Sequence, residues 1–200
     1  MTSIRSDLLS RALEAPTEPH LRPLPPVVAE LLRSLEAPPR LAAHLRAVHD
    51  VAVELADWVA SRYPGLAMDR DAVLIGAATH DVGKTLHPGE LSGPGSAHEA
   101  TGRDLLLEHG FAPGLARFAA THATWDGPDV TIEDLLVSTA DKVWKDKRVP
   151  ELEDRLVRVL SAATGRELWE EYLALDDLLT RLGADADRRL AFQAAFPIGR

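Results

Sequence analysis

Apolar residues recur every three to four positions along most of the chain from residue 40 onward. This spacing places them on one face of a helix, whereas a half-buried strand would alternate apolar and polar residues. No segment alternates convincingly, so the pattern predicts an all-α protein, folded as a helical bundle. Glycine and proline fall between the periodic segments and mark their ends. The predicted helices are residues 40–62, 69–81, 96–110, 113–122, 131–146, 150–163, 166–182 and 184–195.

Prolines divide the chain before this helical block begins. They are Pro16, Pro19, Pro23, Pro25, Pro26, Pro38 and Pro39. Proline fixes its own φ and restricts the residue before it, so residues 1–39 are predicted to form a proline-rich N-terminal arm, extended or irregular over its proline-rich stretch. Residues 40–148 are predicted to form the main domain, and the C-terminal helices of residues 149–200 are predicted to pack on it.

The composition is that of one globular domain. The 200 residues are 46% hydrophobic and include no cysteine, so any metal must be held by nitrogen and oxygen ligands rather than thiolates. No apolar run approaches the roughly 18 residues that span a bilayer. The N-terminal residues lack the apolar core of a signal peptide. We therefore expect a cytoplasmic protein that has no membrane partner.

The charge balance argues against a nucleic-acid polymer as partner. Asp and Glu number 31 against 22 Lys and Arg, a formal net charge of -9. Proteins that neutralise a phosphate backbone usually carry a basic patch or a high isoelectric point. An acidic protein can still bind a small anion where metal ions supply local positive charge.

Ionisable side chains fall on the apolar faces of several predicted helices. His49 lies within the apolar stripe of residues 40–62, whereas His44, five residues earlier, is expected well off that face. The others are His80 with the adjacent Asp81, His98, His122 and Asp141. One buried histidine is more often a satisfied core residue than a ligand. Burying all six groups costs several kcal/mol each unless they pair or bind a metal, and a shared metal site in the bundle core is the simplest solution.

The remaining histidines have simpler interpretations. His20 lies in the proline-rich arm and is expected to be solvated, and His109 lies near a helix end, where a histidine is favourable. His87 follows His80 and Asp81 in a loop. Its side chain is either solvated or lines the site, and the sequence does not choose between the two.

The segment Ala77-Ala78-Thr79-His80-Asp81-Val82-Gly83-Lys84 resembles the signature of the HD superfamily. His49 in an earlier helix and the later His98, His122 and Asp141 complete the pattern H…HD…H…H…D over roughly residues 40 to 148. The two additional histidines resemble those of the dinuclear branch. The segment from His122 to Asp141 is also similar to the bacterial HD-type diadenosine tetraphosphate hydrolases. The resemblance implies an all-α HD-domain bundle that acts as a metal-dependent phosphohydrolase.

The resemblance also implies the ligands of two divalent transition-metal ions. The first ion is expected on His49, His80, Asp81 and Asp141, and the second on Asp81, His98 and His122, with Asp81 as the bridge. Imidazoles and carboxylates suit borderline metals, so we expect Fe or Mn, with Co, Ni and Zn as alternatives. A water between two cations becomes a hydroxide nucleophile near neutral pH. The expected catalytic residues are Asp81 and Lys84.

The expected substrate is a small phosphorylated metabolite, a nucleotide or dinucleotide, cleaved at a phosphoester or phosphoanhydride bond. Lys84 lies one turn past the His-Asp pair, where it would reach a phosphate or favour a helix C-terminus. Arg148 binds substrate or is a solvated charge, and Trp125 stacks on a base or packs in the core; His87 completes these candidate contacts. The apolar residues of the C-terminal helices belong to the core or to a homodimer surface.

Two other functions remain open at this stage. The same six ligands and the HDxGK segment occur in the diiron oxygenases of the superfamily, such as myo-inositol oxygenase, so the ligand set alone does not distinguish a hydrolase from an oxygenase. A non-catalytic sensor or scaffold is the third alternative. It is weakened because no ligand of the pattern is missing.

Overall fold

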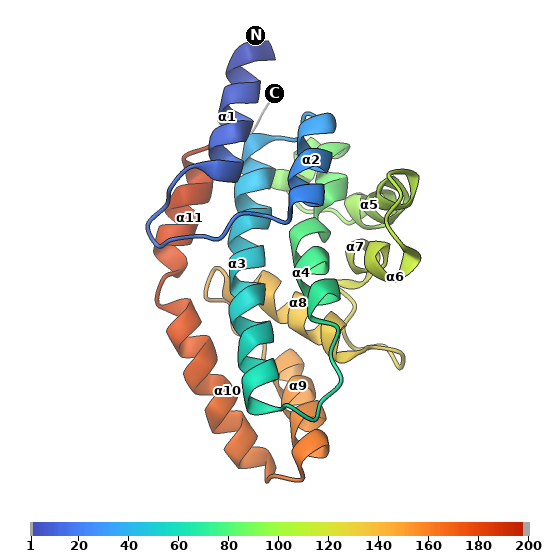
Figure 1. Ribbon diagram of the computed structural model, residues 1–200, viewed down its shortest axis with the longest axis vertical. Helices are drawn as coiled ribbons and strands as arrows, with labels where there is room; N and C mark the ends of the chain where they lie inside the picture. Colours follow the sequence, from blue (N-terminus) through green and yellow to red (C-terminus); the bar gives the residue numbers. More distant parts are fainter. Residues whose placement is uncertain (1, 198–200) are drawn as a thin grey trace.

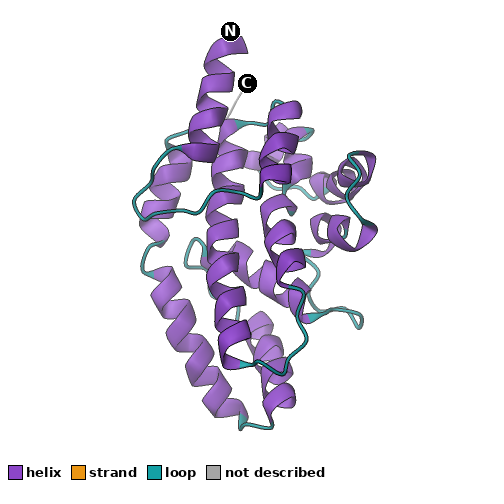
Figure 2. Ribbon diagram, in the orientation of Figure 1, coloured by secondary structure: helices purple, strands orange, loops and turns teal. Residues whose placement is uncertain are grey.

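A computed structural model describes residues 2–197, and within that range the chain forms helices and no strand (Figures 1 and 2). This confirms the predicted all-α class. Residue 1 of the predicted arm and residues 198–200 of the predicted C-terminal part lie outside the described residues. The elements are α1 (Thr2–Glu14), α2 (Pro26–Ser34), α3 (Pro39–Arg62), α4 (Arg70–Thr79), η1 (Val82–Thr85), η2 (Pro88–Leu91), α5 (Ala97–Glu108), α6 (Pro113–Ala116), α7 (Phe118–Thr121), α8 (Ile132–Val143), α9 (Pro150–Thr164), α10 (Leu168–Gly183) and α11 (Ala186–Ala194), where η denotes a 3₁₀ helix.

The N-terminal arm is more ordered than its prolines predicted. Two helices, α1 and α2, lie on either side of an irregular stretch of residues 15–25. The arm was therefore predicted correctly only in that stretch. Pro26 begins α2 at the first helical position, where the missing N–H of proline costs nothing because that N–H has no partner inside a helix. α1 packs along α3, so the arm is part of the bundle.

α3 is the central helix of the bundle (Figure 1). It contacts α1, α4, α8 and α11, and every residue from Leu41 to Val53 is buried. One apolar core joins the C-terminal half of α3 to α4, α8, α9 and α10. A second core joins the start of α3 to α1, α2 and α5. Because this part of α3 is buried on all sides, a side chain on any of its faces points into the interior of the protein.

Two of the C-terminal helices, α9 and α10, extend the bundle beyond the lower end of α3, and α11 lies alongside α3 (Figure 1). α9 ends at Gly165, whose φ of 70° is the left-handed conformation that glycine adopts readily at helix ends. The fully buried Glu171 of α10 accepts hydrogen bonds from the Tyr63 hydroxyl and, at 3.3 Å, from the Arg62 guanidinium. This contact fastens α10 to the end of α3.

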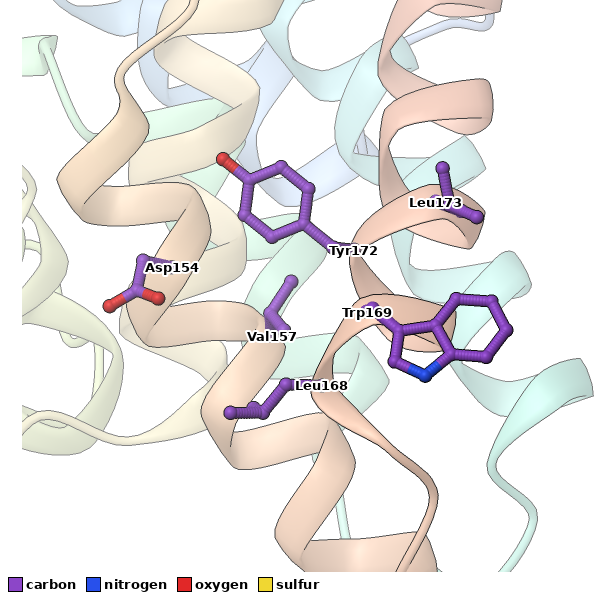
Figure 3. Close-up of a pocket in the computed structure, with 6 residues that line it drawn as sticks. All are labelled: Asp154, Val157, Leu168, Trp169, Tyr172 and Leu173. Carbon is purple, nitrogen blue, oxygen red and sulfur yellow. The ribbon is translucent and has the colours of Figure 1, made fainter.

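A cavity of about 440 Å³ opens between α9 and α10 (Figure 3). None of its lining residues was predicted to belong to the functional site. Trp169 is the most exposed of them, at 62%. The lining comprises Asp154 and Val157 from α9 and Leu168, Trp169, Tyr172 and Leu173 from α10.

Candidate metal centre

Four histidines and two aspartates meet in the interior, in the region where α3, α4, α5, α7 and α8 pack together. All six side chains are buried. They form two groups in which the nitrogen and oxygen atoms lie within 4.8 Å of one another. The first group is His44, His80 and Asp141, and the second is Asp81, His98 and His122.

The structure brings together five of the six predicted ligands and leaves His49 out. His49 Nδ1 lies 3.3 Å from the carbonyl oxygen of Leu74 on α4. The sequence prediction set His44 aside as lying off the apolar face, but His44 Nε2 lies 3.3 Å from His80 Nε2, inside the cluster. The prediction failed because α3 is buried on every side at this point, so an apolar stripe does not identify the face that meets the site.

Asp81 lies between the two groups and directs one oxygen to each. Its Oδ2 is 3.1 Å from His44 Nε2. Its Oδ1 is 3.0 Å from His98 Nε2 and 3.7 Å from His122 Nε2. Asp81 follows His80, the residue that ends α4, and precedes η1. The single carboxylate therefore lies close to both halves of the cluster.

Asp141 completes the first group from α8. Its Oδ1 lies 3.4 Å from His80 Nε2 and 3.9 Å from His44 Nε2. α8 begins with a capping box between Thr131 and Asp134, an arrangement that satisfies free N–H groups at a helix start and fixes where the helix begins. Asp141 lies in the last turn of α8, next to the cluster.

Two of the four imidazole rings, those of His80 and His122, are held by backbone carbonyl groups so that their Nε2 atoms face the cluster. The Nδ1 of His80 lies 2.9 Å from the carbonyl oxygen of Ala77, and that of His122 lies 3.2 Å from the carbonyl oxygen of Ala119. A carbonyl oxygen only accepts hydrogen bonds, so each Nδ1 carries the proton. In a neutral ring, Nε2 then keeps a lone pair, the form in which histidine binds a metal.

Two buried atoms in the cluster face one another without a hydrogen bond. Asp81 Oδ1 and His98 Nε2 are 3.0 Å apart, yet neither has a hydrogen-bond partner in the described part of the chain. Buried polar atoms are normally satisfied. Both atoms can act as electron-pair donors, and a cation between them would satisfy both. The donor set of imidazole nitrogens and carboxylate oxygens therefore fits a divalent transition metal.

The charges of the cluster favour the metal-binding forms of several groups. Burial lowers the pKa of His44 and lowers that of His122 to about 4, so both rings are neutral at pH 7. Burial alone would raise the pKa values of Asp81 and Asp141, but contact with His80 holds both well below the usual range. Burial alone would lower the pKa of His80, yet the charge of Asp81 outweighs it and raises that pKa. The two carboxylates thus require positive charge beside them.

Two lysines supply positive charge at the edge of the cluster. Lys84 Nζ lies 2.6 Å from Asp81 Oδ2, and Lys142 Nζ lies 2.6 Å from Asp141 Oδ2. The side chains are 19% and 20% exposed, respectively, so each extends from the buried carboxylate toward solvent. Lys84 had been predicted at the site. Lys142 had not been predicted at the site, although its position next to Asp141 was a usable signal.

Gly83 allows the His-Asp segment to approach α5. A Cβ at this position would overlap the carbonyl oxygen of His98 and the backbone of Gly102. No side chain other than hydrogen therefore fits between η1 and α5 without moving them apart. The glycine of the HDxGK segment thus has a packing role that brings Asp81 and His98 together.

The three other residues predicted to contact the substrate lie outside the cluster. His87 directly precedes η2 and has a buried Nε2 with no hydrogen-bond partner among residues 2–197. Trp125 is half-buried and packs against the larger core. The Arg148 guanidinium donates hydrogen bonds to Glu153 and Asp176, on α9 and α10, so the geometry gives no support to a substrate contact by Arg148.

Glu90 is a neighbour of the cluster that the sequence analysis missed. Its carboxylate oxygen Oε2 lies 2.5 Å from His98 Nδ1. Glu90 belongs to η2, in a loop for which helical periodicity makes no prediction. Its spacing of eight residues before His98 was the only available signal, and it matches no repeating pattern.

The fold and the cluster define an all-helical protein with a buried histidine and aspartate site suited to divalent metal. The family model described as HD domain matches residues 41–146, more than half of the chain. The chain therefore belongs to the HD domain family, whose members are generally metal-dependent hydrolases that bind divalent metals. No curated protein and no solved structure matches the chain. Across residues 2–197, no helix combines the length and apolar character that crossing a membrane requires.

Proposed function

We propose that this protein is a phosphohydrolase that uses two metal ions to cleave a phosphoester or phosphoanhydride bond in a small phosphorylated metabolite, a nucleotide or dinucleotide. The observation that carries the proposal is the position of Asp81, whose two oxygens face different groups of histidines. A carboxylate placed in this way can bridge two cations, the arrangement of two-metal hydrolases. Membership of the HD domain family supports the same chemistry.

The proposed ligands follow the two groups of side chains. His44, His80, Asp141 and Asp81 would hold one ion, and Asp81, His98 and His122 the other. His44 thus replaces His49 in the ligand set. Fe and Mn are the preferred ions, and Co, Ni and Zn also suit these ligands. When bound, the ions supply a water of lowered pKa and neutralise charge on the phosphoryl group.

Lys84 and Lys142 are proposed to bind the phosphate of the substrate. Each ammonium already contacts a carboxylate of the cluster and is partly exposed. A cation on a ligand carboxylate would be released when that carboxylate is shared with a metal ion. The two ammonium groups would then lie at the entrance, where they attract and orient phosphate oxygens. This recruits an anion locally, although the chain has a net charge of -9.

The chain resembles the dinuclear branch of the HD superfamily and the diadenosine tetraphosphate hydrolases. These two resemblances guide the choice of substrates to test. The diiron oxygenase alternative requires the same ligands, but no observation on the described residues favours it. The two functions differ in their products, because a hydrolase releases phosphate or a nucleotide and an oxygenase consumes oxygen. A direct assay separates them.

The test is metal analysis of the purified protein together with a phosphate-release screen over nucleotides and dinucleotide polyphosphates. We expect two metal ions per chain and hydrolysis of at least one substrate. His122→Gln should lose one ion and at least ~100-fold in activity, since even outer-shell changes cost 10- to 100-fold. The matched control is His109→Gln, which alters an exposed histidine at the end of α5 and should retain both ions. Oxygen consumption without hydrolysis of any substrate would overturn the proposal.

A further inference from the structure

The carboxylate of Glu90 meets the start of α5 through three contacts. Oε1 accepts from the backbone N–H of Ala97 at 3.2 Å, and Oε2 accepts from the backbone N–H of His98 at 3.2 Å. Oε2 also lies 2.5 Å from His98 Nδ1. The first two contacts satisfy free N–H groups at a helix N-terminus, as a capping side chain does. The third contact is different, because it involves the ring of a proposed ligand.

The position of His98 in its helix explains why this ring needs an outside partner. His80 and His122 come at the ends of α4 and α7, so carbonyl groups three or four residues earlier in the same helix hold their Nδ1 atoms. His98 is the second residue of α5. The residues three and four positions earlier, Gly95 and Pro94, precede that helix. The ring therefore has no helical carbonyl behind it, and the Glu90 carboxylate occupies that place.

The chain also leaves room for this carboxylate. A Cβ at Gly95 would overlap the carboxylate of Glu90. Glycine at this position allows the loop to fold closely over the side chain. The Glu90 contact is thus accommodated by the surrounding backbone in addition to being made by the side chain itself.

We propose that Glu90 is a positioning residue: it accepts the Nδ1 proton of His98 and thereby turns His98 Nε2 toward Asp81 Oδ1, 3.0 Å away. Such a carboxylate behind a histidine fixes the orientation of the ring and increases its basicity as a ligand. The proposed metal site predicts that loss of Glu90 weakens one of the two ions. That consequence rests on the proposed function, whereas the orientation of the ring does not.

The first test uses metal-free protein and follows the Nδ1 proton of His98 by proton and nitrogen NMR, with the signal assigned by its absence in His98→Gln. Native protein should show a hydrogen-bonded, downfield Nδ1 proton. Glu90→Ala should lose it, and Glu90→Gln, which keeps one acceptor oxygen, should retain it with a smaller downfield shift. Glu99→Gln is the matched control, because Glu99 is an acidic residue in the first turn of the same helix. An unchanged Nδ1 proton in Glu90→Ala would overturn the inference.

The second test titrates Mn²⁺ into the same proteins and measures the number and affinity of bound ions. Glu90→Ala should bind one ion ~10- to 100-fold more weakly than native protein, while Glu99→Gln should match native protein. Native affinity for both ions in Glu90→Ala would overturn the inference and leave the proposed function intact. If native protein bound no metal, the proposed function would fail, and the Nδ1 proton would still decide the role of Glu90.

Discussion

The chemistry of the cluster depends on which atom of each side chain faces inward. Backbone carbonyls hold Nδ1 of His80 and His122, so Nε2 is the atom that each ring directs at the cluster. Asp81 uses its two oxygens in different directions. A glutamate, one methylene longer, would move both oxygens and lose this match. The length of the side chain at position 81 therefore matters as well as its charge.

Substitution of His44 should weaken metal binding, whereas substitution of His49 should not. His44→Gln removes a nitrogen that lies within the cluster and should weaken binding of one ion by at least ~100-fold, more than a typical outer-shell change. His49→Gln alters a buried side chain directed at the Leu74 carbonyl, so it should lower stability modestly and retain both ions. Metal content of the two purified variants is the measurement. Loss of metal in His49→Gln alone would contradict the arrangement described here.

The residues found by sequence and those missed differ in a physical way. The apolar faces of the predicted helices and the pattern H…HD…H…H…D agree on the later ligands, which are His80, Asp81, His98, His122 and Asp141. Every residue of α3 from Leu41 to Val53 is buried. Helical periodicity therefore could not show that His44, rather than His49, faces the cluster. The loop residue Glu90 has no periodic neighbours at all. Its role depends on where a loop folds in space, which sequence spacing does not encode.

At the scale of helices, the sequence predicts those that have periodic apolar residues and helix breakers at both ends. Each of the eight predicted helical segments corresponds to helix in the structure, although residues 113–122 form two short helices, α6 and α7. The helices α1 and α2 were missed because the prolines from Pro16 to Pro26 were interpreted as signs of irregular chain and no helix was expected before residue 40. A proline at a helix start is compatible with the helix that follows it, as α2 demonstrates.

The contact between α10 and α3 should make stability depend on pH. Burial opposes ionisation of Glu171, but the hydrogen bond from Tyr63 and the charge of Arg62 outweigh it and lower its pKa. A lowered pKa in the folded state stabilises the fold above the unfolded pKa of about 4.3, and this stabilisation is lost as pH falls through the folded pKa. Glu171→Gln should lower the free energy of unfolding by ~2 kcal/mol at pH 7, since it disturbs a buried hydrogen-bonded group.

Chemical denaturation between pH 7 and pH 3 is the measurement for this contact. The difference in free energy of unfolding between native protein and Glu171→Gln should shrink as the pH falls. Asp177→Asn is the control, because Asp177 is exposed on the same helix and should follow native protein throughout. A difference that stays constant with pH would show that the ionised carboxylate of Glu171 contributes nothing.

At the scale of the whole molecule, the cluster connects the bundle. Its six side chains come from α3, the segment between α4 and η1, α5, the end of α7 and α8. α9, α10 and α11 contribute no residue to it. A metal ion bound here would therefore hold together the central helices, while the C-terminal helices stabilise the bundle through apolar packing and the Glu171 contact.

Removal of metal should accordingly lower the melting temperature. Free metal at 100-fold its dissociation constant stabilises a fold by about 2.7 kcal/mol, which corresponds to a shift of roughly 5–10 °C for a chain of this size. Differential scanning calorimetry with added Mn²⁺ and with chelator measures it. His122→Gln should give a smaller difference between the two conditions. An identical melting temperature in native protein with and without metal would indicate that the ligands bind no ion under those conditions.

The contact between Trp144 and His44 gives the site an optical reporter. The two rings lie edge to face with centroids 4.9 Å apart, and the indole is almost fully buried. Indole fluorescence is quenched by paramagnetic ions at short range, so loading of Fe, Mn or Co at His44 would dim the emission of Trp144. The chain has three further tryptophans, Trp58, Trp125 and Trp169, so a Trp144→Phe variant would identify the part of the fluorescence change that comes from Trp144.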